Sequence, residues 1–315
     1  MNEFSITEPI FGIFQVLLLV VLSPLIVGIM RKTKAKSQKR TGAPIIQPYF
    51  DILKLVKKEE IVSDQSSWIF RCNPWVNFVT TISAAFFVPV SIVYSPFGVI
   101  GDILLVIGLF GLGKFFTILA GLDVASSFGG LGGSREIMFS ALVEPALFIT
   151  IFVVAIFYGG TNISTIVTSA NDISFFESPG VIFALISFFI ILMVETGKLP
   201  IDNPSTHLEL TMIHEATTLE YSGKSLALIE WSQAIKQIIL LTLFVNIFIP
   251  WGISDNFSLI GISFGIIFII VKIISLSILI ALIETRVAKW RLFRVPDLIA
   301  ISIASSMIGV IFFFI

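Results

Sequence analysis

Long apolar stretches alternate with short polar connections along almost the whole chain. A membrane-spanning helix needs about 20 predominantly apolar residues, and about eight stretches approach this length. The predicted spans are Glu8–Met30, Pro74–Tyr94, Val99–Leu122, Glu136–Tyr158, Pro179–Gly197, Ser225–Ile249, Ser258–Ile283 and Pro296–Ile315. The pattern predicts an all-α polytopic membrane protein, with residues 1–315 forming a single integral membrane domain.

The basic residues are confined to alternate connections and to the spans. All 20 Lys and Arg residues lie after the first, third, fifth and seventh spans, or at or within a span. The connections around Tyr94–Val99, Gly159–Ser178 and Pro250–Phe257 contain none. Cytoplasmic connections carry an excess of Lys and Arg. We therefore expect the basic connections to face the cytoplasm and both termini to lie on the outer side.

The composition argues against several other classes of protein. Hydrophobic residues make up 56% of the chain and charged residues 13%, with a mean hydropathy of +1.00, whereas a soluble domain has about 25% charged residues. The net charge of −1 does not indicate nucleic-acid binding. A single cysteine, Cys72, excludes a disulfide framework and an all-cysteine iron–sulfur site within this chain. Neither histidine has partners at a metal-ligand spacing, so no metal site is expected.

Two of the basic connections contain segments with predicted structure of their own. Residues 48–62 place apolar side chains at helical spacing, opposite Asp51 and three lysines, and so predict an amphipathic helix on the membrane or under a partner. These apolar residues are Tyr49, Ile52, Leu53 and Val56. Residues 198–224 interleave apolar side chains with acids, which predicts a partly buried acidic loop.

A glycine run, Gly129–Gly133, precedes the fourth span. It could form a hinge or a turn that allows close packing. No Lys-Ser/Thr pair follows it, which argues against a phosphate-binding loop.

Ionisable residues inside the spans are the strongest functional signal. A charge at mid-span costs about 2.5–3.5 kcal/mol on insertion scales, so such residues usually face a polar interior. The clear cases are Lys114, Glu144, Lys236 and Lys272. Three further acids lie near the cytoplasmic ends of spans, where they could equally be interfacial anchors. They are Glu195, Glu230 and Glu284.

The fourth span places several polar groups on one face. Glu136, Ser140 and Glu144 are four residues apart, so they share a side of the helix, and Pro145 removes a backbone hydrogen bond beside Glu144. A buried lysine–glutamate pair could exchange protons or form a static ion pair between helices. Charges in several spans favour a relay, because one pair would be enough for packing.

The acidic loop resembles that of the complex I subunit 1 family. The similarity rests on the run from Glu195 to Asp202, on Leu208-Glu209-Leu210, and on Leu219-Glu220-Tyr221-Ser222-Gly223. The first connection resembles the same family through the segments Gln38–Gly42 and Gln47–Leu55.

Other motifs are more similar to the hydrogenase branch of this family, the subunit-1-like membrane proteins of formate hydrogenlyase and hydrogenase-4 complexes. These motifs are Gly121-Leu122-Asp123, Ser134-Arg135-Glu136, Val143-Glu144-Pro145 and Phe248-Ile249-Pro250-Trp251-Gly252. The loop departs from the quinone-type pattern at Ser205 and His207, where acids are usual. A short insertion also lies between Glu209 and Glu220.

The resemblance implies a membrane subunit that binds no cofactor itself and anchors a hydrophilic redox arm. Partner subunits would carry iron–sulfur clusters and a nickel–iron centre, and a quinone could bind nearby. The implied partners are hydrogenase-like large and small subunits, a ferredoxin-like iron–sulfur subunit and antiporter-like membrane subunits. The implied location is a prokaryotic cytoplasmic membrane.

The spans and the resemblance together indicate three groups of functional residues. The candidate ion-translocation residues are Lys114, Glu136, Glu144, Glu195, Glu230, Lys236 and Lys272. The candidate coupling loop to the redox arm contains Asp202, His207, Glu209, Glu215 and Glu220. Arg40, Asp51 and Lys54 are expected to dock the arm.

The leading hypothesis is a coupling subunit of a complex-I-related [NiFe]-hydrogenase-type oxidoreductase that moves H⁺ or Na⁺. The quinone-site subunit of an NADH:quinone dehydrogenase is an alternative, against which the altered loop argues mildly. An autonomous ion transporter is another, although about eight spans without an internal repeat are unusual for one. A purely structural anchor would explain the loops but not Glu144, Lys236 and Lys272.

Overall fold

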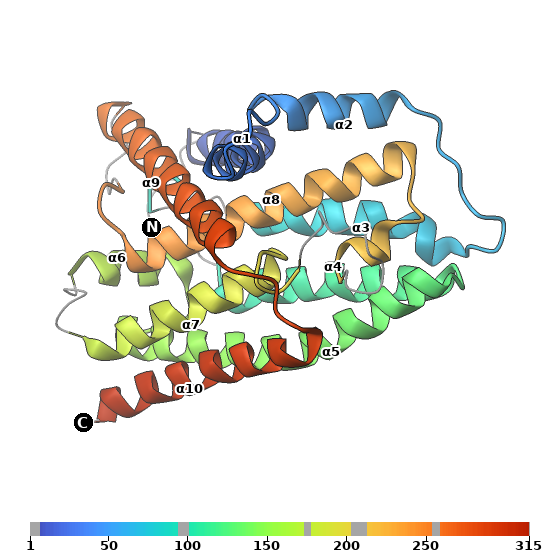
Figure 1. Ribbon diagram of the computed structural model, residues 1–315. Coiled ribbons are helices and arrows are strands. Elements are labelled where there is room, and N and C mark those ends of the chain that lie inside the picture. The colour runs from blue at the N-terminus through green and yellow to red at the C-terminus, as the bar shows by residue number, and fades with distance from the viewer. Residues whose placement is uncertain (1–6, 94–100, 173–177, 203–212, 254–258, 315) are drawn as a thin grey trace.

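The computed structural model describes residues 7–93, 101–172, 178–202, 213–253 and 259–314, which form a bundle of α-helices (Figure 1). The helices are α1 (Thr7–Ser37), α2 (Gln47–Lys57), α3 (Trp68–Ala85), α4 (Ile103–Asp123), α5 (Ser127–Tyr158), α6 (Ile163–Asp172), α7 (Pro179–Glu195), α8 (Gly223–Phe248), α9 (Leu259–Arg286) and α10 (Val295–Phe314). Among the described residues, the short 3-10 helices η2 (Glu215–Thr218) and η3 (Leu292–Arg294) lie in connections. The all-α polytopic prediction is confirmed.

Each predicted span corresponds to one of these helices. Within the described ranges, α1, α4, α5, α8, α9 and α10 are long and apolar enough to cross a membrane. The helix α7 is shorter, at 17 residues. The helix α3 begins at Trp68 rather than Pro74, and Asn73, Asn77 and Thr80 lower its apolar content. These polar residues face other helices of the bundle, which explains why a weakly apolar helix can belong to it.

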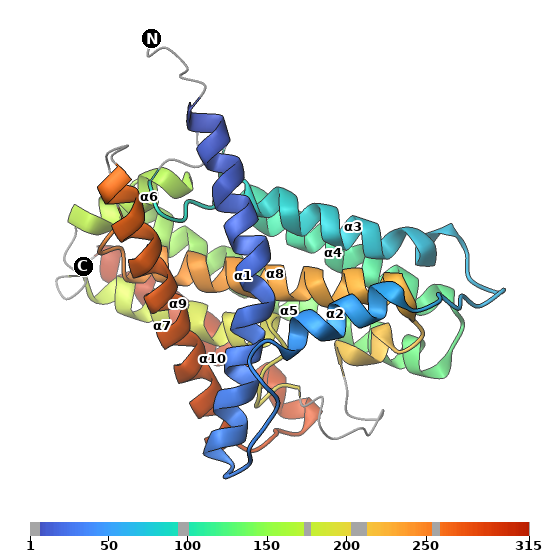
Figure 2. The same ribbon diagram turned by 90° about the horizontal axis from the view of Figure 1, so that it is seen from above.

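The basic connections gather at one end of the bundle, which we call the basic end. Near the ends of α1 and α9, the Lys34 ammonium lies 2.6 Å from the Glu284 carboxylate. The amide of Ser67, before α3, donates to the carboxylate of Asp123 at the end of α4 (2.7 Å). The helix α1 begins and α10 ends at the opposite end (Figure 2). Which end faces the cytoplasm stays a prediction from the positive-inside rule.

Short polar caps fix where several helices begin. The side chains of Ser67, Asp102 and Ser126 accept amide hydrogen bonds from the first turns of α3, α4 and α5 at 3.2, 2.9 and 3.0 Å. Such caps satisfy amide groups that have no partner within the helix. The helix α5 ends at Gly159, whose φ of 82° lies in the left-handed region that favours glycine.

The helix α6 occupies a segment that the sequence interpretation treated as a simple connection. Four of its apolar residues recur at helical spacing and are buried: Ile163, Ile166, Val167 and Ala170. Through this face α6 packs against α5 and α8 at the opposite end. The helical period was present in the sequence, but the segment is too short and too polar to register as a span.

The predicted amphipathic helix is confirmed as α2, but it ends at Lys57 rather than Val62. The residues that follow run along the start of α8, where the Ser222 hydroxyl accepts the amide of Ile61 (2.8 Å). Figure 2 shows α1 crossing α8 steeply, with α2 lying against the same helix.

The two faces of α2 have different surroundings. Asp51, which the sequence places opposite the apolar face, is half-buried, 3.5 Å from Arg31 of α1. Leu53 and Val56, which belong to the apolar face expected against the membrane or a partner, are 56% and 44% exposed. The inward side of α2, with Asp51, borders a polar cavity.

The glycine run forms the first turns of α5 and serves close packing rather than a hinge. A Cβ atom on Gly129 would overlap the Gly121 carbonyl oxygen of α4, and one on Gly132 would lie 2.9 Å from the Thr217 backbone nitrogen. Small residues allow helix backbones to approach this closely in membranes. The run therefore holds α4, α5 and η2 together beside the charged residues described below.

Replacing Gly129 with Ala should lower the melting temperature of the protein in detergent, because the added methyl group must push α4 away from α5. The matched control is Gly130→Ala, whose Cβ would meet nothing within 4 Å. Alanine favours a helix over glycine by about 1 kcal/mol, so this control should keep or raise the melting temperature. Equal melting temperatures for the two variants would contradict the close-packing role.

Candidate functional site

Three intramembrane charges meet at the centre of the bundle. One oxygen of the Glu195 carboxylate lies 2.7 Å from the Lys114 ammonium, and the other lies 2.7 Å from the Lys236 ammonium. The side chains are only 8%, 11% and 19% exposed, respectively. We call these three residues the central cluster. Glu195 is therefore the shared partner of two lysines, which argues against the alternative that it is only an interfacial anchor.

Each member of the central cluster comes from a different helix. Glu195 is the last residue of α7, Lys114 lies in the second half of α4, and Lys236 lies in the middle of α8. A carboxylate at a helix C-terminus faces the negative end of the helix dipole, which the two ammonium groups offset. The Lys236 ammonium also lies 5.6 Å from the centre of the Phe110 ring, within the range of a cation–π contact.

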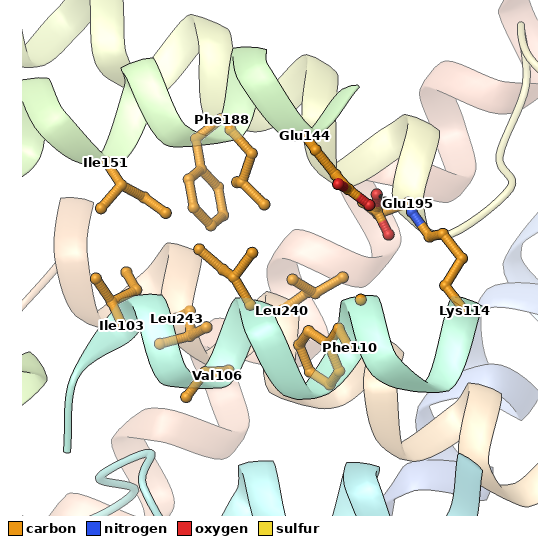
Figure 3. Close-up of a pocket in the computed structure, with 13 residues that line it drawn as sticks. Ile103, Val106, Phe110, Lys114, Glu144, Ile151, Phe188, Glu195, Leu240 and Leu243 are labelled. Atoms are coloured by element: carbon orange, nitrogen blue, oxygen red, sulfur yellow. Dashed lines mark hydrogen bonds and ion pairs between the residues drawn. The ribbon is translucent and has the colours of Figure 1, made fainter. Parts of the chain in front are cut away.

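Glu144 lies beside the central cluster, at the edge of a narrow apolar cavity of about 30 Å³ (Figure 3). Lys114, Glu144 and Glu195 line one end of this cavity. Its remaining walls are apolar and extend along α4 toward Ile103, near the opposite end of the bundle. A cavity of this size has room for roughly two water molecules, but an apolar one stays dry. It therefore separates the central cluster from the opposite end.

Glu136 forms a second charged contact, with His214 from the segment before η2. His214 Nδ1 lies 2.8 Å from the Glu136 carboxylate, and His214 Nε2 lies 3.3 Å from the Val194 carbonyl oxygen of α7. The Asp202 carboxylate accepts the backbone amides of Ile213 and His214 at 3.0 and 3.2 Å. The contact thus links α5, α7 and the acidic loop.

The pKa of His214 is raised above its ordinary value. Burial of the ring by itself would lower the pKa, but the nearby Glu136 carboxylate stabilises the charged ring by attraction and by hydrogen bonding. Sequence reasoning considered His214 only as a metal ligand and missed this contact. Only its position in the acidic loop hinted at it, since nothing in the spacing relates it to Glu136.

A large cavity of about 1190 Å³ connects the basic end with both charged contacts. Its deep wall includes Lys114, Glu136, Glu195, His214 and Lys236. Its outer wall comes from the ends of α1 and α2, the start of α8 and the acidic loop. Outer-wall residues include Arg31, Arg40, Asp51, Lys198, Asp202, Glu215 and Glu230. A cavity this large with polar walls can hold many waters, so the buried charges have polar access from the basic end.

Lys198 lies on the wall of this cavity, close to the Lys34–Glu284 ion pair. Burial and the positive charge of Lys34 lower the pKa of Lys198 to about 8, against the opposing effect of Glu284. Glu284 is buried, and it also accepts the Leu199 amide at 3.3 Å. Glu284 therefore ties α9 to α1 and to the end of α7, which is more than an interfacial anchor.

Two predicted ion-translocation residues lie apart from the central cluster. The Lys272 ammonium donates to the carbonyl oxygens of Ile249 (2.7 Å) and Trp251, and so satisfies groups at the end of α8. Glu230 is exposed on the wall of the large cavity, near its outer part. The structure brings together Lys114, Glu144, Glu195 and Lys236, but not these two.

The remaining predicted residues lie at the basic end or outside the described residues. His207 and Glu209 fall within 203–212, outside the described residues. Glu215 and Glu220 are exposed, and Asp202 is buried. Of the predicted docking residues, Arg40 and Lys54 are exposed, whereas the Asp51 carboxylate accepts a hydrogen bond from the side-chain amide of Gln47 (Nε2 to Oδ1, 2.9 Å).

The sequence matches the NADH dehydrogenase family over residues 10–314. The chain belongs to this family. It is 34% identical to formate hydrogenlyase subunit 4 of Escherichia coli (strain K12) over 287 residues, which cover 91% of this chain and 92% of that protein. It is 35% identical to hydrogenase-4 component C of the same organism over 284 residues, covering 90% and 88%. The resemblance to the complex I subunit 1 family and to its hydrogenase branch is confirmed.

The fold also matches a solved structure of the membrane-bound sulfane sulfur reductase, an archaeal respiratory membrane complex. The TM-score is 0.83 at 21% identity, and the match covers 96% of this chain and 100% of the other. This likeness shows that the two chains share a fold.

Replacing Glu195 with Gln should strongly destabilise the bundle, because two buried ammonium groups lose their shared counter-ion. Removing one partner of a buried ion pair typically costs about 3–5 kcal/mol. The double variant Glu195→Gln/Lys236→Met removes one of the stranded charges and should recover part of the loss. Thermal unfolding in detergent measures both. A double variant no more stable than Glu195→Gln would contradict the shared-partner arrangement.

Proposed function

We propose that this chain is the membrane subunit that anchors the redox arm of a complex-I-related, [NiFe]-hydrogenase-type oxidoreductase and couples electron transfer to movement of H⁺ or Na⁺. The observation that carries the proposal is the continuous large cavity between the basic end and the central cluster. The family membership and the names of its relatives indicate the kind of complex in which that cavity would operate.

The two cavities support translocation because they differ in polarity. The large cavity has polar walls and reaches the central cluster from the basic end. The apolar cavity lies on the other side of the cluster, beyond Glu144, and its dry walls would resist ion leakage. A coupled device needs both features, since ions must reach the charged groups from one side without crossing freely. A structural anchor would need neither.

Coupling would begin at the acidic loop. Electron transfer in the docked arm would change the charge near Asp202 and Glu215, which line the outer part of the large cavity. A change in protonation there would alter the balance among Glu195, Lys114 and Lys236, in which each lysine donates a hydrogen bond to the Glu195 carboxylate. Glu144 would then take up or release the translocated charge at the boundary between the two cavities.

The basic end is the proposed docking surface for the redox arm. Arg40 and Lys54 are exposed there, beside the apolar side chains of Phe50 and Leu53 on α2. The iron–sulfur and nickel–iron centres would lie in the partner subunits, namely hydrogenase-like large and small subunits and a ferredoxin-like subunit. Antiporter-like subunits would complete the membrane part, in a prokaryotic cytoplasmic membrane.

A quinone-site subunit remains the second candidate function. The observation in its favour is the size of the large cavity and its mixture of apolar and polar walls. A quinone-analogue photolabel that reacts with residues of this cavity would support it.

The first experiment is to purify the complex that contains this chain in mild detergent and to measure its nickel, its iron and its subunits. We expect nickel and iron together with hydrogenase-like large and small subunits. Iron without nickel would shift the proposal to a quinone-linked or sulfur-linked relative. Neither metal, with no partner subunits, would contradict the proposal and favour an autonomous transporter.

Replacing Glu144 with Gln should abolish ion translocation in proteoliposomes while the complex stays assembled and transfers electrons, because an amide neither titrates nor carries a charge. The control is Asp297→Asn, an exposed acid at the start of α10 that lines neither cavity. Loss of assembly in Glu144→Gln would instead mark Glu144 as structural, and unchanged translocation would exclude it from the path.

A further inference from the structure

We propose that His214 and Glu136 together hold one exchangeable proton, and that the charge of this pair controls the partner choice of Lys114 in the central cluster. The inference rests on the proposed coupling function and adds a residue to it. His214 is not among the acids that the family resemblance implies, and its contacts assign it this part.

The two neighbours of the imidazole ring determine how many protons it must carry. The Val194 carbonyl oxygen near Nε2 can only accept a hydrogen bond, so Nε2 carries a proton. The Glu136 oxygen lies 2.8 Å from Nδ1, and two unprotonated acceptor atoms would repel each other at this distance, so the proposal places a second proton between them. This proton sits on Nδ1 of an imidazolium ion or on the carboxyl oxygen of a neutral acid. In either case the pair is neutral overall.

Loss of that proton changes the charge of the pair by one unit. Unloading transfers the shared proton to a water molecule in the large cavity and leaves a neutral imidazole beside the Glu136 carboxylate, with a net charge of −1. Loading reverses the step. The ring lines the cavity and 27% of its side chain is accessible, so both directions can occur without passing through the apolar core.

The charges that face the pair come from every element packed around it. They are Lys114 of α4, Glu195 at the end of α7, Asp202 and Glu215 of the acidic loop, and Lys236 of α8. Apart from Asp202 and Glu215 of the acidic loop, the three acids Glu136, Glu144 and Glu195 balance the three bases His214, Lys114 and Lys236 when all six are charged. Unloading the pair therefore leaves an excess negative charge on the deep wall of the large cavity.

Lys114 is the residue that can respond to this charge. Its ammonium is bound to Glu195 and is also attracted electrostatically by Glu136. An unloaded Glu136 would compete with Glu195 for Lys114, and Glu195 would keep only Lys236 as its partner. The proton on the His214–Glu136 pair thus determines, through Lys114, how strongly the charge of Glu195 is neutralised. The pair itself does not need to contact Glu195.

The acidic loop fixes the ring in this position. The Asp202 carboxylate accepts the amides of Ile213 and His214, and the Thr217 hydroxyl donates to the His214 carbonyl oxygen at 2.8 Å. Asp202 itself lies 3.6 Å from the Lys289 ammonium. A change in the position or charge of Asp202 would therefore shift the backbone segment that carries His214. This segment connects the proposed docking surface with the His214–Glu136 pair.

The first test is the titration of His214 by nuclear magnetic resonance in the full-length chain, labelled on histidine and inserted into lipid nanodiscs. The chain has two histidines, and His207→Asn identifies the signal of the other. We expect the pKa of His214 to lie above the ordinary value near 6.5. In Glu136→Gln the pKa of His214 should fall below that value, because burial, the largest effect, and the charge of Lys236 both lower it and only Asp202 still raises it. A pKa that is not raised, or one that Glu136→Gln leaves unchanged, would overturn the proposal.

The second test uses the assembled complex in proteoliposomes. His214→Asn keeps an amide donor for Glu136 but has no titratable group, so electron transfer should persist while ion translocation is lost. The matched control is Ser134→Ala, an exposed residue of α5 two positions from Glu136 that does not line the cavity. Wild-type translocation in His214→Asn, or failure of that variant to assemble, would overturn the proposed role.

The two tests separate this inference from the function on which it rests. A wild-type complex that transfers electrons without moving ions would defeat the proposed function, and the titration alone would then decide whether the pair holds a proton. A complex that translocates ions but in which the pKa of His214 is not raised would support the proposed function and contradict the proposed role of the His214–Glu136 pair.

Discussion

One carboxylate shared by two lysines is the constraint on which the rest of the structure depends. Moving an ion from water into a protein interior costs several kcal/mol even after relaxation, so Glu195, Lys114 and Lys236 are tolerable only while all three meet. That requirement fixes the register of α4, α7 and α8 relative to one another. The close contact of α4 with α5 through Gly121 and Gly129 then carries the same register to the helix that bears Glu136 and Glu144.

The arrangement of polarity around the central cluster follows from which faces the other helices present to it. Toward the basic end, α1, α2 and α8 contribute charged and amide side chains, so the enclosed space is large and polar. Toward the opposite end, α4, α5 and α8 contribute branched and aromatic side chains, so the remaining space is narrow and apolar. The cluster thus lies at a boundary between wet and dry regions, where a small change in charge has the largest effect on hydration.

The acidic loop is connected to this boundary by specific hydrogen bonds rather than by proximity alone. Asp202 holds the backbone on which His214 is carried, and His214 contacts both Glu136 of α5 and the carbonyl group of Val194, one residue before Glu195. Charge at the docking side and charge in the membrane interior are therefore parts of one continuous polar network. Its members come from segments far apart in the chain.

The sequence by itself determined the class of the protein, the positions of the spans, the basic connections and the family, because apolar length and charge placement are local properties that a membrane selects directly. It also named Lys114, Glu136, Glu144, Glu195 and Lys236 as unusual. Only the tertiary structure decided their partners: Glu195 joins two lysines, Lys272 closes the end of α8, His214 meets Glu136, and Asp51 turns inward. The physical reason is that pairing depends on the rotation and register of whole helices, which contacts distant in sequence impose.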